Sequence, residues 1–154
     1  MCRLAAMLVV LALSTACAAK SVPVLVGQSA LGLAQSVGQL QVAAEQLHRA
    51  GALTTPQALA VQQRLLTVNT RIGQIIPTLR AIDRVQQAGA PIGATEVEAV
   101  LAAVVAVSEE LSLVVAGVPI AETTRQLLEL VRTAQQAVAT TLIEVARLRA
   151  QVGG

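Results

Sequence analysis

The fold is decided by residues 54–89, which read TTPQALAVQQRLLTVNTRIGQIIPTLRAIDRVQQAG. Apolar residues recur in this stretch at alternating intervals of three and four: Ala58, Val61, Leu65, Val68, Ile72, Ile75, Leu79 and Ile82. This heptad spacing puts them in one stripe along an α-helix, and such a stripe is buried against other helices. Thr54 and Gln57 have the spacing of a capping box, and Pro56 is tolerated in a first turn. The stretch therefore predicts one long amphipathic helix of a helical bundle.

Three other segments predict further helices. Residues 23–50 carry a stripe with the same alternation: Val26, Ala30, Leu33, Val37, Leu40, Ala44 and Leu47. Residues 120–151 carry another: Leu127, Val131, Ala134, Val138, Thr141, Val145 and Leu148. Residues 95–116 are apolar on all sides between Ala99 and Val107, which predicts the most buried helix of the set.

The segments between these helices are short and contain glycine or proline. Gly51 is placed to end the first helix, and a second capping box, Thr95 to Glu98, is placed to begin the third. Helices joined by short loops pack as antiparallel neighbours. We therefore expect residues 23–154 to form an all-α domain, an antiparallel up-down four-helix bundle with long amphipathic helices.

Composition excludes several classes of partner. The chain has no Trp, Tyr or Phe, so its core is aliphatic and it has no aromatic platform on which bases or sugars would stack. The formal net charge is only +2, and the basic residues form no run. Because nucleic-acid binding depends on clustered basic side chains, we expect no nucleic-acid partner.

The sequence also offers little material for catalysis. His48 is the sole histidine and stands at a predicted helix end, where it suits the helix dipole. The densest acids are Glu96, Glu98, Glu109 and Glu110, but the Glu-x-x-His pattern of carboxylate metal sites in bundles is absent. No nucleophile with a base and no glycine-rich phosphate loop can be found. We expect a protein that is not an enzyme and that holds no metal or cofactor.

Some polar residues lie in or beside the apolar stripes. These are Gln62, Asn69, Ser108 and Thr141. The simplest interpretation is that they set the register of the bundle through hydrogen bonds between helices, and the alternative is that they line a ligand cavity. Asp83 is the sole aspartate, and its helical spacing from Arg80 and Arg84 predicts a surface ion pair.

The first seventeen residues are organised differently from the rest. Arg3 supplies a positive charge, Leu4 to Leu13 is an almost unbroken apolar run, and small residues follow up to Cys17. This is the layout of a secretion signal. The segment Leu13-Ser14-Thr15-Ala16-Cys17 resembles the lipobox of bacterial lipoproteins.

The resemblance implies a domain organisation and an address. In that family the cysteine becomes the first mature residue and carries acyl chains, so Cys17 would be the lipidation site. Residues 1–16 would be a lipoprotein signal peptide, and residues 17–22 a lipid-anchored tether. The protein would belong to the bacterial cell envelope and face the periplasm. Ala18 follows the cysteine, and the family's sorting pattern then favours the outer membrane.

Alternatives to this interpretation remain at the sequence level. Ser14-x-Ala16 and Ala16-x-Ala18 are sites that an ordinary signal peptidase would cleave, which would release a soluble secreted protein. For the domain itself, the first hypothesis is a structural or interaction module that meets a protein partner or a second copy through its helix faces. The second is a carrier or sensor that binds an apolar, lipid-like ligand between the helices, and a ligand-sized cavity would favour it.

Overall fold

The computed structural model describes residues 21–152, so the predicted signal peptide and Cys17 lie outside the described residues. Four α-helices make up most of this range, and no strand occurs within it. They are α2 (Val22–Arg49), α3 (Thr55–Gln87), α4 (Ala94–Ala116) and α5 (Arg125–Val152), with a short 3-10 helix, η1 (Glu122–Thr124), before α5. The prediction of an all-α protein is confirmed.

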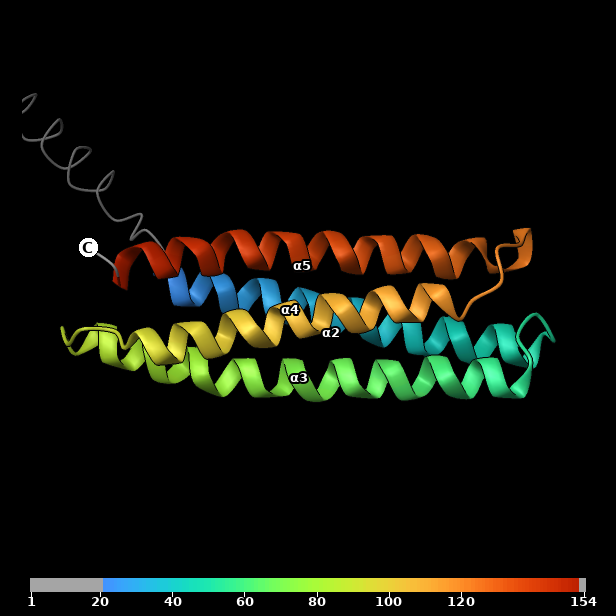
Figure 1. Ribbon diagram of the computed structural model, residues 1–154, viewed down its shortest axis with the longest axis horizontal. Coiled ribbons are helices and arrows are strands. Elements are labelled where there is room, and N and C mark those ends of the chain that lie inside the picture. The colour runs from blue at the N-terminus through green and yellow to red at the C-terminus, as the bar shows by residue number, and fades with distance from the viewer. Residues whose placement is uncertain (1–20, 153–154) are drawn as a thin grey trace, which may run out of the picture.

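The helices lie side by side along one long axis (Figure 1). Helix α2 packs against α3 and α5, and α4 packs against the same two helices. The α2–α3 and α4–α5 connections lie at one end of the molecule, and the α3–α4 connection lies at the other, with the end of α5 (Figure 1). Each helix therefore covers its apolar stripe with two neighbours.

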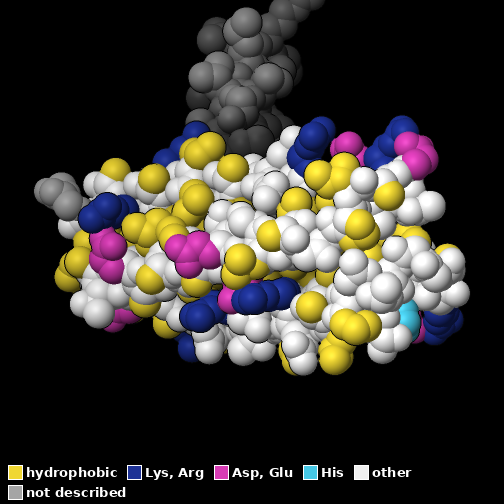
Figure 2. Space-filling view, turned by 45° about the vertical axis from the view of Figure 1, so that its right-hand side comes forward, with side chains coloured by type: hydrophobic (Ala, Val, Ile, Leu, Met, Phe, Trp, Pro, Cys, Tyr) yellow, Lys and Arg dark blue, Asp and Glu magenta, His cyan; other side chains and the backbone are white. Residues whose placement is uncertain are grey.

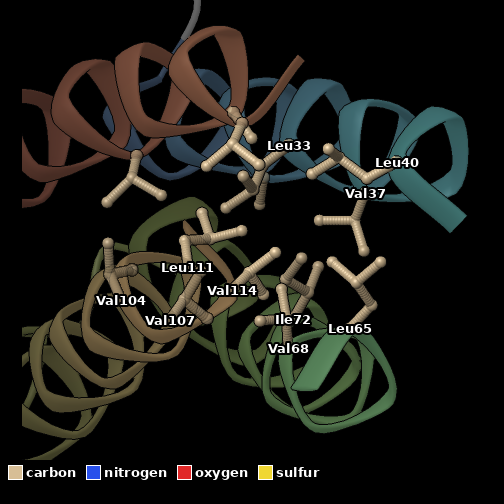
Figure 3. Packing of buried hydrophobic residues seen from close by; sticks show 14 of the residues in the cluster. Leu33, Val37, Leu40, Leu65, Val68, Ile72, Val104, Val107, Leu111 and Val114 are labelled. Atoms are coloured by element: carbon tan, nitrogen blue, oxygen red, sulfur yellow. The ribbon is translucent and has the colours of Figure 1, made fainter. Parts of the chain in front are cut away.

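Three of the four stripes that build the core are those that the sequence predicts. All eight residues of the α3 stripe are buried, as are all seven of the α5 stripe. In α2 the stripe is buried from Val26 to Ala44, while Leu47 is half-buried at the helix end. Side chains from α2, α3 and α4 converge on one aliphatic interior (Figure 3). Pro77 lies on the exposed side of α3, and the helix continues through it.

The prediction that residues 95–116 form the most buried helix is wrong. Only 28% of the most apolar window of α4 is buried, and the side chains of Val105 and Leu113 are 41% and 47% exposed. The buried stripe of α4 has the same heptad spacing as the others: Val97, Val100, Val104, Val107, Leu111 and Val114. A helix with two neighbours fully buries one stripe, so apolar residues on its other side, such as Val105 and Leu113, face outward. Among the described helices, α4 alone has the length and hydropathy to cross a bilayer, a property that it shares with core helices of soluble proteins.

Two helix ends depend on glycine in a left-handed conformation. Gly51 follows α2 with a φ of 74°, and Gly89 follows α3 with a φ of 69°. After each glycine, a backbone N–H turns back to the helix: Ala52 donates to the Leu47 carbonyl at 2.9 Å and Ala90 to the Val85 carbonyl at 3.1 Å. This is the Schellman arrangement, in which glycine is favoured because it has no Cβ. The prediction that Gly51 ends the first helix is confirmed.

Of the two predicted capping boxes, one is present. The backbone N–H of Thr54 donates to Oε1 of Gln57 at 2.9 Å, as expected. The box at Thr95–Glu98 is wrong, because α4 begins earlier, at Ala94, with Gly93 as its N-cap residue. Glu96 is then the third helical residue, and its carboxylate folds back against Gly93 so closely that a Cβ there would clash. Glycine at the N-cap thus makes room for the glutamate.

The start of the last helix is set by a threonine that the sequence analysis did not single out. Helix α5 begins at Arg125 rather than at the predicted residue 120. Thr124 is fully buried before it, and its hydroxyl accepts a hydrogen bond from the Ala121 N–H at 3.1 Å. The same hydroxyl lies within donating distance of the Pro119 and Ala121 carbonyl oxygens. Thr124 therefore holds the α4–α5 connection closed.

We expect Thr124→Ala to lower the free energy of unfolding by about 1–2 kcal/mol, because it leaves partly buried backbone groups without their partner. Thr123→Ala is the matched control, since Thr123 is exposed and its loss is expected to cost less than about 0.5 kcal/mol. Urea unfolding followed by circular dichroism would measure both. Equal midpoints for the two variants would show that the Thr124 hydroxyl does not hold the connection.

Candidate functional site

The predicted site residue, Cys17, lies outside the described residues, but the start of α2, which follows it in the chain, is described. Ser21 immediately precedes α2, and its hydroxyl donates to Oδ1 of Asp83 on α3 at 2.8 Å. The other carboxylate oxygen of Asp83 accepts a hydrogen bond from Gln87 at 2.7 Å. The beginning of α2 is thus fastened to the last turns of α3, at the end of the bundle that carries the α3–α4 connection.

The predicted ion pair between Asp83 and Arg80 or Arg84 is wrong. Both oxygens of Asp83 accept hydrogen bonds from uncharged groups, Ser21 and Gln87. Within residues 21–152, the ion pairs involve other arginines, and both Arg80 and Arg84 are exposed. The sequence pattern missed this because Ser21 stands 62 residues from Asp83 and becomes its neighbour only when the helices pack.

A groove lies directly beside the Ser21–Asp83 contact. It has a volume of about 220 Å³ and runs between the first turns of α2 and the last turns of α3. Its lining is largely apolar, with two charged residues at one side: Pro23, Val24, Gly27, Gln28, Leu31, Ile76, Leu79, Arg80 and Asp83. We call it the anchor-side groove, because it lies beside the start of α2, the helix that follows the predicted lipidation site Cys17.

A larger groove of about 750 Å³ lies between α2 and α5 and contains several amides. Its lining residues are Gln35, Gly38, Gln39, Val42, Ala43, Gln46, Gln126 and Leu130. Both grooves open widely at the surface of the described bundle. The residues of the apolar stripes, by contrast, are packed and buried between the helices. These grooves do not have the enclosed form expected for a carrier of an apolar ligand.

Three of the acidic and histidine residues singled out from the sequence make contacts between elements of the bundle. Glu110 pairs with Arg64 of α3 at 3.0 Å, and Glu98 pairs with Arg149 of α5 at 2.7 Å, so each fastens two helices. Nδ1 of His48 lies 3.2 Å from the Leu53 carbonyl, a hydrogen bond across the α2–α3 connection. No group of His, Cys, Asp or Glu that could hold a metal occurs within the described residues.

The polar residues in or beside the apolar stripes make two kinds of hydrogen bond, one between helices and one within a helix. Nε2 of Gln62 donates to the Gln41 carbonyl at 3.0 Å, so the predicted bond between helices is present there. For Thr141 the prediction is wrong, since its buried hydroxyl donates to the Ala137 carbonyl of its own helix at 2.8 Å. A threonine within a helix can always reach the carbonyl four residues earlier, so it needs no partner across the seam. Asn69 and Ser108 are half-buried.

The outer surface carries charges of both signs, with hydrophobic side chains between them (Figure 2). Four of the six described ion pairs join residues three or four apart in the chain, and in three of these four both side chains are exposed. Such pairs contribute at most about 0.5 kcal/mol each. On the face in Figure 2, basic and acidic side chains lie close to one another.

Comparison of the chain with known family models, curated proteins and solved structures found no match. The function is therefore argued from the residues of the chain itself.

Proposed function

We propose that the chain is a lipid-anchored helical bundle of the bacterial cell envelope that serves as a structural or protein-interaction module. The observation that carries this proposal is the N-terminal sequence, in which Arg3, the apolar run to Leu13 and the small residues before Cys17 follow one another in the order of a lipoprotein signal. Cys17 carries the lipid, and the resemblance favours the periplasmic face of the outer membrane.

The bundle in this proposal is an antiparallel up-down four-helix bundle. Short connections support that topology, because they leave little chain with which to cross from one end to the other. The contacts also support this topology. Consecutive helices pack against each other, and the first helix, α2, packs against the last, α5.

A non-catalytic role is supported by what the polar groups do. His48 and Thr124 hold connections between helices, and Glu98 and Glu110 hold pairs of helices together. These polar groups already make contacts that stabilise the bundle. The faces that remain for a protein partner carry exposed glutamines and isolated large apolar side chains, including Val42 and Leu66.

Substitution of the two cysteines tests the proposal. Cys17→Ser is expected to move the protein from the membrane fraction to the soluble fraction, or to block processing, and to abolish fatty-acid labelling. Each buried methylene of an acyl chain contributes about 0.8 kcal/mol, so losing two or more chains removes the anchor. The measurement is fractionation of cells grown with labelled palmitate.

Cys2→Ser is the matched control, because Cys2 lies in the segment that the signal peptidase removes. It is expected to fractionate and to label as the wild type does. If the wild type itself is soluble and unlabelled, the secreted, unanchored alternative holds and the proposal fails.

A further inference from the structure

We propose that one end of the bundle rests on an anionic phospholipid surface, with Arg80 and Arg84 binding lipid phosphates and the anchor-side groove lying against the interface. This surface consists of the first turns of α2 and the last turns of α3, and we call it the anchor-side face. The inference depends on the proposed lipidation of Cys17 and specifies which part of the bundle meets the membrane.

The length of the tether brings this face to the membrane. Four residues lie between Cys17 and the start of α2 at Val22, so the chain takes five Cα-to-Cα steps to reach the helix. A fully extended chain spans at most about 3.6 Å per residue, so the first turn of α2 lies within roughly 18 Å of the lipidated cysteine. Pro23 in that turn lines the anchor-side groove, and Ser21 is bonded to Asp83. The α3 turns around Asp83 are therefore held as close to the lipid as α2 is.

Charge on this face complements a phosphate surface. Arg80 and Arg84 are one helical turn apart, exposed, and outside the ion pairs of the described residues. The acid nearest to them in sequence, Asp83, already accepts hydrogen bonds at both oxygens. Lys20 adds a further positive charge in the tether. Guanidinium groups bind phosphate oxygens bidentately, and basic residues next to a lipid anchor strengthen attachment to anionic leaflets.

The apolar part of the same face suits the boundary between headgroups and acyl chains. Leu31 stands at the anchor-side groove with 54% of its side chain exposed, and Val24 and Ile76 line the groove beside it. Apolar side chains next to basic ones are the arrangement with which proteins lie in a membrane interface. Tether reach, charge and apolar lining thus point to the same occupant.

The absence of aromatic residues makes a direct test available, since a single introduced tryptophan is the only fluorophore in the chain. The full-length lipidated protein carrying Leu31→Trp would be reconstituted with vesicles of phosphatidylcholine alone or of phosphatidylcholine with phosphatidylglycerol. We expect a shift of its emission to shorter wavelength, and quenching by brominated lipid, chiefly in the anionic vesicles.

Leu59→Trp is the matched control. Leu59 is 57% exposed, close to the value for Leu31, but it lies near the start of α3. It is 21 residues from Arg80 along the helix, which is about 32 Å at 1.5 Å per residue. Its emission is expected to be the same in both vesicle types. Equal shifts at the two positions would overturn the assignment of this face.

The arginines are tested in the Leu31→Trp background. Arg80→Gln and Arg84→Gln are each expected to lower about fivefold the ratio of membrane-bound to free anchor-side face that the emission shift reports in the anionic vesicles. Arg71→Gln is the control, because Arg71 is also exposed and outside the described ion pairs but lies nine residues before Arg80, in the middle of α3. A double variant that keeps the wild-type lipid dependence would contradict the inference.

Two readouts separate the possible failures. Flotation of the wild type with neutral vesicles reports the lipid anchor alone, so a protein that floats but shows no shift at Leu31→Trp refutes only the inference. A protein that does not float refutes the proposed function. A shift that appears without vesicles and grows with protein concentration would assign the face to a second copy of the chain and overturn the lipid assignment.

Discussion

Ile75→Asp is expected to unfold the bundle. Ile75 is 1% exposed in the middle of the α3 stripe, where an aspartate would be surrounded by aliphatic side chains without a partner for its charge. The penalty for burying an unpaired carboxylate is several kcal/mol, set against a total stability of about 5–15 kcal/mol for a domain. Far-UV circular dichroism and thermal melting would show lost helicity or a sharply lowered melting temperature.

Gln74→Asp is the control for this substitution, because Gln74 is the neighbouring residue and its side chain is exposed. It introduces the same side chain into the same helix turn, so it reports the helix propensity of aspartate without its burial. A melting temperature close to that of the wild type is expected. Equal destabilisation by the two substitutions would mean that the register of α3 is wrong.

Leu65→Ala is expected to lower the free energy of unfolding by about 2–5 kcal/mol. Leu65 is fully buried, and removal of its side chain leaves a cavity among aliphatic neighbours. The core has no aromatic side chain, and its largest members are leucine and isoleucine. These neighbours are too short to fill the cavity left by the leucine side chain. Urea unfolding followed by circular dichroism would give the difference.

Leu66→Ala is the control, because it makes the same truncation at the next residue of α3. Leu66 is 63% exposed, so its truncation removes little buried surface, and alanine is at least as good a helix former. The expected change is within about 0.5 kcal/mol of zero. A large loss at Leu66 would instead show that this side chain is covered, for example by a partner or by a second copy.

The core could be predicted from the sequence because burial here follows local periodicity. The eight stripe residues of α3 and the seven of α5 were identified by heptad spacing alone, and each is buried. Spacing along a helix is a local property that does not depend on which neighbour covers the stripe. The same reasoning failed for residues 95–116, where an excess of apolar residues conceals the stripe. The number of apolar residues overestimates how much of this helix is buried, because its two neighbouring helices cover only one side of it.

The contacts of the candidate site could not be predicted, since they join residues that are distant in the chain. The bond from Ser21 to Asp83 and the anchor-side groove exist only once α2 and α3 are paired in their actual register. Arg80 and Arg84 were assigned to Asp83 because sequence spacing cannot reveal a competing hydroxyl from another helix. The proposed lipidation of Cys17, by contrast, depends wholly on the sequence, as Cys17 lies outside the described residues.

If the protein is held by its N-terminus, as we propose, the hydrogen bond between Ser21 and Asp83 has a mechanical consequence. When a partner pulls on the outer surface of the bundle, tension along the tether enters the domain at Ser21. The bond passes part of that load to α3 before α2 can be peeled away. The buried contacts of α2 extend from Val26 to Ala44, so a pull along its axis would load them together in shear rather than one after another. The proposed attachment point would thus be joined to two helices at once, so a pull on it would be resisted by α3 as well as by α2.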